Sequence, residues 1–415
     1  MNHYSLYLNK NGKQKALLTA LFADTLEQLE SDRLVQRALD GRHPGGPLSV
    51  VAIGKAAPAM ASGALAALGT QVRRCLVVTR HGGAGPWMKR LAGADVIEAG
   101  HPLPDADSLR AGRALLDFLA DAAGEWLFLL SGGASALVEV PRAGVTLDAL
   151  RRANRWLIGS GLDIGAINSV RCRLSRIKAG GLLDRLRGRP ARVLLVSDVR
   201  GDDPALIGSG LLYPGAAARA LPAGLPDWLR ALCAGPVADV GRRPVQHRII
   251  ANLELAREQV ERAGRRRGLE VHRHVPELDN DAADTGRELA RYLLEAPAGL
   301  HLWGGEPRVT LPARPGRGGR CQQLALAAAT GMAGRDDIWL LAAGTDGSDG
   351  PGDDAGALVD GATLARGGLA GLDAADCLRR ADAGRFLEAS GDLLSAGPTG
   401  TNVRDLVLAL KSGAA

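Results

Sequence analysis

The chain has 415 residues, of which 46% are hydrophobic, 3% aromatic and 23% charged, and its formal net charge is +6 at pH 7. This length predicts two domains rather than one core. The scarcity of aromatic residues and the interleaving of basic with acidic residues argue against a nucleic-acid surface. No apolar run approaches the roughly 18 residues that a membrane helix needs, so we expect neither nucleic acid nor a membrane as a partner.

The cysteines and the N-terminal residues suggest a compartment. The five cysteines are odd in number and show no paired spacing, which favours reduced thiols over disulfides or a zinc site. Residues 1–15 are polar and lack the apolar stretch of a signal peptide. We therefore expect a cytoplasmic protein.

The first half of the chain has the pattern of a doubly wound sheet. Residues 14–40 carry apolar side chains at helical spacing and predict a leading helical segment. Short apolar runs then alternate with glycine-rich turns and helical stretches, which predicts a mostly parallel α/β sheet with its sites at the carboxyl ends of strands. The expected strands lie at 48–53, 75–79, 126–130 and 192–196.

A second series of apolar runs follows the proline- and glycine-rich stretch at 212–244. We place a domain boundary near residue 240, so that 1–240 form the first domain and 241–415 a second, smaller α/β domain. Arg265–Arg267 is expected at the exposed end of a helix, with Gly264 as the C-cap. The expected strands of this series lie at 247–250, 269–274, 300–303, 309–311 and 338–342.

Two strand ends carry turns suited to phosphate. Lys55 follows a glycine at the end of a strand and would lie beside a helix N-terminus, which attracts anions. The turn Ser131-Gly132-Gly133-Ala134-Ser135 would expose consecutive backbone N–H groups to phosphate oxygens. A chance lysine and tight strand–helix packing by glycine are the structural alternatives. Neither turn is a P-loop or a dinucleotide fingerprint.

Further polar groups have both a functional and a structural interpretation. Arg171, Ser175 and Lys178 lie three or four residues apart, so they would share a helix face that either meets an anionic substrate or is solvated. Asp198 follows a strand and suits Mg²⁺, which prefers one or two carboxylates with substrate phosphates. His101, in a proline-ordered loop, is either structural or part of a site.

Taken together and in order, the motifs resemble the glycerate 2-kinases of the MOFRL (DUF4147 plus MOFRL) type, from about residue 16 to about residue 410. The motifs that carry the resemblance are Gly54-Lys55-Ala56, Gly100-His101-Pro102, Ser131-Gly132-Gly133, Leu174-Ser175-Arg176-Ile177-Lys178, Ser197-Asp198-Val199, Gly304-Gly305-Glu306, Gly316-Arg317-Gly318-Gly319-Arg320, Thr345-Asp346-Gly347 and Gly397-Pro398-Thr399-Gly400-Thr401-Asn402.

The resemblance implies a Rossmann-like domain followed by the MOFRL domain, with the active site in the cleft between them. It implies ATP- and Mg²⁺-dependent phosphorylation of D-glycerate to 2-phosphoglycerate, and it is compatible with a homodimer. Lys55, Arg320 and Asp349 would be catalytic, and Asp198 and Asp349 would hold Mg²⁺. The residues expected to bind substrate or nucleotide are Ser131, Gly132, Gly133, Ser135, Asn168, Arg171, Lys178, Glu306, Thr399 and Asn402.

The chain departs from the usual family pattern in three motifs, at Ala134, at Leu211 and Leu212, and at Cys321 and Gln323. These departures keep two alternatives open, a kinase for another small hydroxy acid and a catalytically impaired relative. Some members of the family carry the label hydroxypyruvate reductase, but no dinucleotide fingerprint stands between an expected strand and helix here.

Overall fold

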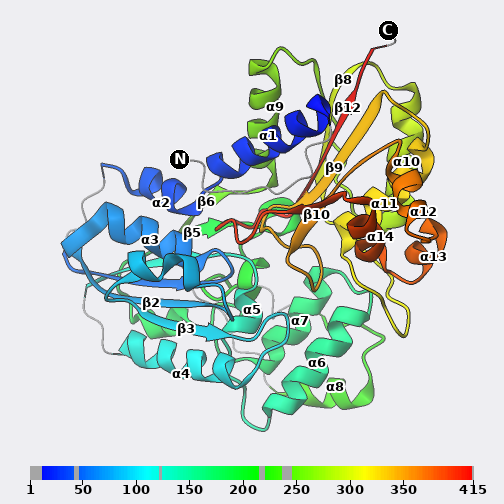
Figure 1. Ribbon diagram of the computed structural model, residues 1–415. Coiled ribbons are helices and arrows are strands. Elements are labelled where there is room, and N and C mark those ends of the chain that lie inside the picture. The colour runs from blue at the N-terminus through cyan, green and yellow to red at the C-terminus, as the bar shows by residue number, and fades with distance from the viewer. Residues whose placement is uncertain (1–11, 42–45, 121–123, 215–219, 236–244, 414–415) are drawn as a thin grey trace. The chain divides into compact units, whose positions relative to one another are not determined.

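The computed structural model describes residues 12–41, 46–120, 124–214, 220–235 and 245–413. The chain divides into two units, each built around one six-stranded sheet (Figure 1). The parallel-sheet unit comprises Ser31–Asn252 and Gly400–Asn402, and the mixed-sheet unit comprises Met1–Glu30, Leu253–Thr399 and Val403–Ala415. None of the described helices is long and apolar enough to cross a membrane.

All strands of the parallel-sheet unit run parallel, in the order β3-β2-β1-β4-β5-β6. This arrangement confirms the expected doubly wound sheet. The order reverses between β1 and β4, and the carboxyl ends of strands at such a switch point form the usual binding crevice of this fold. The strands are β1 Leu48–Ile53, β2 Val72–Arg80, β3 Asp95–Ala99, β4 Glu125–Leu130, β5 Ala191–Val196 and β6 Gln246–Ala251.

Helices cover this sheet because its central strands are apolar on both faces; every residue of β1 is buried. Thr146 caps α6 and Asp163 caps α7 through their side-chain oxygens. The α-helices are α2 Ser31–Leu39, α3 Ala57–Leu68, α4 Ala106–Ala120, α5 Ala134–Leu137, α6 Leu147–Gly159, α7 Ile164–Leu174 and α8 Asp227–Leu232. The 3-10 helices are η1 Gly69–Gln71, η2 Gly85–Leu91, η3 Leu183–Leu186, η4 Arg200–Asp202 and η5 Ile207–Ser209.

The mixed-sheet unit has the strand order β11-β10-β9-β12-β8-β7; among its described strands β7 and β8 pair in parallel and the other neighbours pair antiparallel. Its strands are β7 Val271–Arg273, β8 Gly299–Gly305, β9 Ile338–Gly344, β10 Asp354–Asp360, β11 Leu393–Ser395 and β12 Asp405–Lys411. Its helices are α1 Lys13–Gln28, α9 Leu253–Arg266, α10 Ala282–Glu295, α11 Arg320–Met332, α12 Thr363–Leu369, α13 Ala374–Arg379 and α14 Ala383–Ser390.

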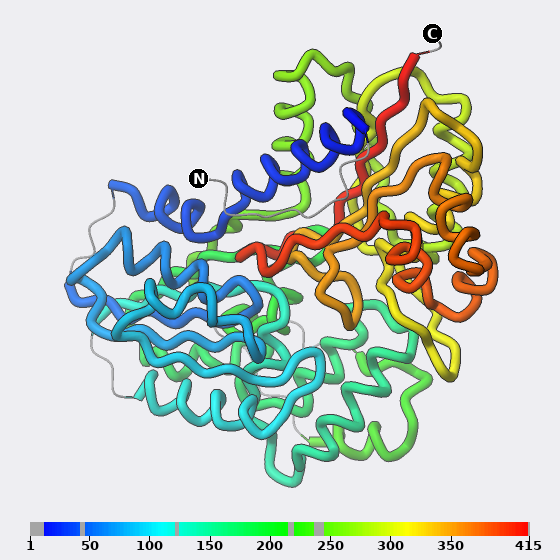
Figure 2. The backbone as a smooth tube through the Cα atoms, viewed as in Figure 1, coloured from blue at the N-terminus to red at the C-terminus, as the bar shows by residue number. Residues whose placement is uncertain are grey.

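The leading helical segment forms two helices that belong to different units. α1 packs beside α9 in the mixed-sheet unit (Figure 2), whereas α2 packs on α3 in the parallel-sheet unit. The boundary expected near residue 240 lies outside the described residues. The chain divides after Asn252, because β6 is hydrogen-bonded to β5 and completes the first sheet.

Two local predictions were wrong. Residues 309–311 form no strand; the neighbouring Arg308 makes only an isolated bridge to Asp281. Gly264 lies inside α9, and the turn that follows the helix uses Gly268, whose φ of +74° favours glycine.

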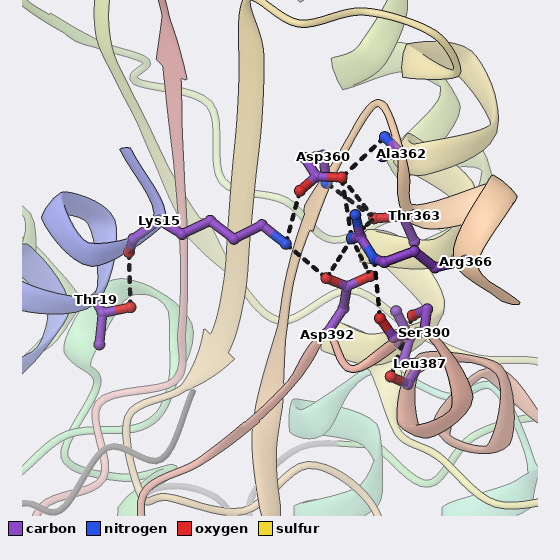
Figure 3. Close-up of polar contacts among 9 residues, drawn as sticks. All are labelled: Lys15, Thr19, Asp360, Ala362, Thr363, Arg366, Leu387, Ser390 and Asp392. Atoms are coloured by element: carbon purple, nitrogen blue, oxygen red, sulfur yellow. Dashed lines mark hydrogen bonds and ion pairs between the residues drawn. The ribbon is translucent and has the colours of Figure 1, made fainter. Parts of the chain in front are cut away.

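A buried cluster of charges fixes α1 to its own unit (Figure 3). The Lys15 ammonium lies 2.8 Å from Asp360 Oδ2 and 2.6 Å from Asp392 Oδ1, and Arg366 Nη2 also contacts both carboxylates. Lys15 and Asp392 are buried. Burial raises the pKa of Asp360, but Lys15 and Arg366 outweigh this effect and lower that pKa overall. Each charge is therefore balanced by an opposite one inside the unit.

Replacing Lys15 with methionine is expected to lower the free energy of unfolding by roughly 3 kcal/mol, because it leaves two acidic groups around one guanidinium. We place the loss at the lower end for buried pairs because Arg366 still contacts both carboxylates. Urea unfolding measures the change. Lys13→Met, at an exposed position two residues earlier on the same helix, is the control. Equal stabilities of the two variants would contradict this account.

Candidate functional site

The two turns expected to bind phosphate, after β1 and after β4, are hydrogen-bonded to each other at the switch point of the parallel sheet. The backbone N–H of Lys55 donates to Gly132 O at 2.9 Å, and that of Ala56 donates to Ser131 Oγ at 3.0 Å. A Cβ on Gly54, whose φ is +134°, would lie 2.1 Å from Ser131 Oγ. Glycine is therefore required before Lys55 for these turns to meet.

Lys55 and His101 flank the glycine turn after β4. A Cβ on Gly133 would lie 3.3 Å from Lys55 Cγ and 3.2 Å from His101 Nε2. His101 comes from the loop that follows β3. The structure thus places this histidine at the candidate site, a question that the sequence left open.

Asp198 and Asn402 meet over the same turn. Asn402 Nδ2 donates to Asp198 Oδ2 at 3.0 Å. A Cβ on Gly132 would lie 1.7 Å from Asp198 Oδ2 and 2.4 Å from Asn402 Nδ2, so only glycine lets the pair approach the backbone here. Asp198 follows β5, and Asn402 lies in the segment Gly400–Asn402 of the same unit. Lys55, His101, Asp198 and Asn402 therefore surround one turn.

A chain of hydrogen bonds connects two further predicted residues. Ser135 Oγ and Ser209 Oγ are 2.8 Å apart, and Ser209 Oγ donates to Asn168 Oδ1 at 2.8 Å. Asn168 Nδ2 in turn donates to Leu206 O at 3.1 Å. Ser209 was not among the predicted site residues, although its position between Gly208 and Gly210 was a signal. These hydrogen bonds hold α5, which begins in the glycine turn, against α7 and η5.

Arg171, Ser175 and Lys178 do not share a helix face, because α7 ends at Leu174. Arg171 Nε donates to Asn154 Oδ1 at 2.9 Å, and burial lowers the pKa of its guanidinium. Ser175 and Lys178 both contact the carboxylate of Glu139, and all three are buried. The charge of Lys178 is thus balanced inside the protein.

In the mixed-sheet unit, Arg320 is the first residue of α11 and is held by two carboxylates. Its Nε and Nη2 donate to Asp405 Oδ2 and Oδ1 at 2.5 and 2.9 Å, and its Nη1 lies 3.2 Å from Glu306 Oε1. Burial of the guanidinium opposes its charge, but Asp405 and Glu306 outweigh this effect and hold the pKa of Arg320 well above its usual value.

Asp349 caps the helix that carries Arg320. Its Oδ1 accepts from the backbone N–H of Cys321 at 3.0 Å, and its Oδ2 accepts from that of Gln322 at 2.8 Å. Burial and the nearby Asp405 raise the pKa of Asp349 to about 7. Asp349 therefore sets the start of α11 while its carboxyl titrates near neutral pH.

Another predicted site residue, Thr399, donates a hydrogen bond from Oγ1 to Thr345 O at 2.5 Å.

The pKa of Asp349 predicts a pH-dependent stability. The folded protein binds the proton of the Asp349 carboxyl more tightly than the unfolded chain does. The contribution of this proton to the free energy of unfolding is therefore fully present below the ordinary pKa of 3.8 and is lost as pH rises to about 7. This contribution is at most roughly 4 kcal/mol. Urea unfolding at several pH values in this window is expected to show a smaller decline with pH for Asp349→Asn than for the wild type. Equal declines would contradict the raised pKa.

Comparison with known proteins shows the family to which the chain belongs. Residues 17–222 match a domain of unknown function (DUF4147), and residues 299–405 match the MOFRL family. The D-glycerate 2-kinase of Thermotoga maritima is 34% identical over 422 residues, covering 95% of this chain and 98% of that protein. The chain belongs to the glycerate 2-kinase family of DUF4147–MOFRL proteins.

The structural comparison leads to the same family. The crystal structure of a glycerate kinase from Thermotoga maritima has a TM-score of 0.81 and 32% sequence identity to this chain, covering 96% of it and 99% of that chain. An Agrobacterium vitis protein, whose name proposes a hydroxypyruvate reductase, is 36% identical over 87% of this chain and 98% of its own length. Fold and family recognition from the sequence are thus confirmed.

Proposed function

We propose that this protein transfers the γ-phosphoryl group of ATP to the C2 hydroxyl of D-glycerate, forming 2-phosphoglycerate and ADP. The observation that supports this function most is the meeting of Lys55, Asp198 and Asn402 over the Gly132 turn. A lysine beside backbone N–H groups at a switch point suits phosphate oxygens. The kinase names of the relatives supply the reaction type.

Phosphoryl transfer needs positioning and charge neutralisation more than covalent chemistry. Lys55 would neutralise charge on the transferring phosphoryl group as a compact point charge. Arg320 would bind an anionic group of the substrate through its planar fork. Gly132 and Gly133 would supply turn N–H groups to ATP, whereas the N–H of Ser131 already donates to Ile53 O at 3.0 Å. Because Lys55 and Arg320 belong to different units, the proposed reaction requires both units.

The residues at the Gly132 turn fit Mg²⁺, which prefers oxygen ligands and takes one or two carboxylates together with phosphates. Asp198 supplies a carboxylate, and the Asn402 amide oxygen is a second oxygen donor beside it. The absence of a Cβ on Gly132 leaves room for this pair. We assign the metal to Asp198 rather than Asp349, because Asp198 lies beside the turn proposed to bind the phosphates, whereas Asp349 belongs to the mixed-sheet unit. When bound, Mg²⁺ would neutralise the phosphates.

Asp349 is our candidate for accepting the proton of the substrate hydroxyl. A general base works best with a pKa near the operating pH, and the pKa of Asp349 is raised to about 7. A carboxylate has more lone pairs than the two backbone N–H groups use.

We also propose a cytoplasmic location, because the five cysteines are free and buried.

The experiment is ADP release by the purified protein with ATP and Mg²⁺, with and without D-glycerate. We expect release that depends on glycerate. The name of the Agrobacterium vitis relative adds a second arm, oxidation of NADH or NADPH with hydroxypyruvate. The turn after β1 reads Gly54-Lys55-Ala56-Ala57 rather than a dinucleotide fingerprint, so we expect no oxidation. Oxidation without glycerate-dependent ADP release would overturn the proposal.

A further inference from the structure

We infer that Asp405 is a positioning residue for Arg320. Glu306 occupies the part of the guanidinium to which an anionic group of the substrate binds. The inference rests on the proposed function, in which Arg320 binds such a group. Nothing in the sequence pattern singles out Asp405. Its role follows from how the two carboxylates around Arg320 differ in burial, geometry and attachment to the fold.

Asp405 is fixed by the middle of the mixed sheet. It is the first residue of β12, which pairs with both β8 and β9, and there it lies opposite Gly305 and Gly344. Its side chain is 2% exposed. A carboxylate held in this way cannot follow a moving arginine, so the arginine takes its position from the carboxylate.

The contact between Asp405 and Arg320 fixes the plane of the guanidinium. Both carboxylate oxygens are engaged, one by Nε and one by Nη2, in the fork arrangement that gives arginine pairs their directionality. A buried carboxylate is costly to leave unpaired, so this pair stays formed. The Nε edge of Arg320 is therefore unavailable to a ligand.

Glu306 makes a weaker contact on the opposite edge. Its carboxylate lies 3.2 Å from Nη1 and is 48% exposed. Exposed ion pairs contribute little, because water and salt screen them. An incoming carboxylate or phosphate can replace Glu306 at Nη1, whereas it cannot replace Asp405. Two acidic groups around one guanidinium also repel an anion until Glu306 moves away.

The test compares kcat and KM of the full-length kinase variants Asp405→Asn and Glu306→Gln. Asp405→Asn is expected to lower kcat/KM by about 10²-fold, because a misplacement of about 1 Å costs that much in oriented reactions. Glu306→Gln is expected to lower the KM for glycerate a few-fold, because it removes the competing charge. Asp284→Asn, whose side chain is 64% exposed in a surface pair with Arg287 of the same unit, is the control and should change neither constant.

Folding is separated from positioning by a second variant and by a double mutant. Asp405→Glu retains the buried charge but displaces the fork, so it should fold like the wild type in thermal unfolding and still lose kcat. In an Arg320→Ala background, Asp405→Asn should lower the residual rate no further. An additional loss there, or a normal kcat for folded Asp405→Glu, would overturn the positioning role. A raised KM in Glu306→Gln would make Glu306 a substrate ligand instead. Normal activity of Arg320→Ala would refute the proposed function itself.

Discussion

Replacing Lys55 with alanine is expected to lower kcat by at least 10²-fold to 10³-fold, the usual loss when one group that stabilises transition-state charge is removed. Lys55 follows β1 at the switch point, and its backbone is hydrogen-bonded to the turn that carries Gly132. Its ammonium would be the positive charge that this unit supplies to the transferring phosphoryl group. Steady-state ADP release at saturating ATP and glycerate measures the loss.

The control is Lys89→Ala. Lys89 lies in η2 of the same unit and is exposed, so its removal changes the net charge equally without touching the turn. We expect its kcat to equal that of the wild type. A folded Lys55→Ala variant with a rate close to the Lys89→Ala rate would remove Lys55 from the proposed machinery.

Arg320 is expected to resist even conservative replacement. Arg320→Lys retains the charge but has a point-like ammonium that cannot contact both oxygens of Asp405 and still present a second edge to an anion. We expect both Arg320→Lys and Arg320→Ala to lose at least about 10²-fold in kcat/KM. The same assay, with glycerate as the varied substrate, separates kcat from KM.

Arg379→Ala is the matched control for Arg320. Arg379 lies in α13 of the same unit, and its side chain is 69% exposed in a surface pair with Asp376. Such pairs contribute little to stability, so this variant should fold and turn over normally. If Arg320→Lys matched it in kcat/KM, the bidentate geometry would have no catalytic importance.

Strands with strong β-branched or aromatic patterns could be predicted from the sequence. β1 has the expected bounds because Leu48 and the continuous apolar run at 50–53 lead directly into a glycine turn. β10 was missed because it reads Asp-Ala-Gly-Ala-Leu-Val-Asp, in which alanine and glycine have weak strand propensity. β12 was missed because its run of Leu, Val and Ala does not distinguish a strand from a buried helix.

The site could be predicted only where it follows a local motif. Lys55, Ser131 and Asp198 were found because each follows a strand end, and such ends converge in a parallel sheet. Asp405 lies 85 positions from Arg320 and Glu139 lies 39 from Lys178. Their importance comes from side chains that meet only in the folded chain, so no local spacing could indicate them.

The most direct test of the proposed function is ³¹P NMR of the product formed from ATP, Mg²⁺ and D-glycerate by the purified wild-type protein. We predict that 2-phosphoglycerate accumulates in an amount equal to the ADP formed, and that the Lys55→Ala variant forms at least about 10²-fold less of both products over the same time. ADP formation without a phosphorylated glycerate, or 3-phosphoglycerate as the product, would contradict the proposed phosphorylation at C2.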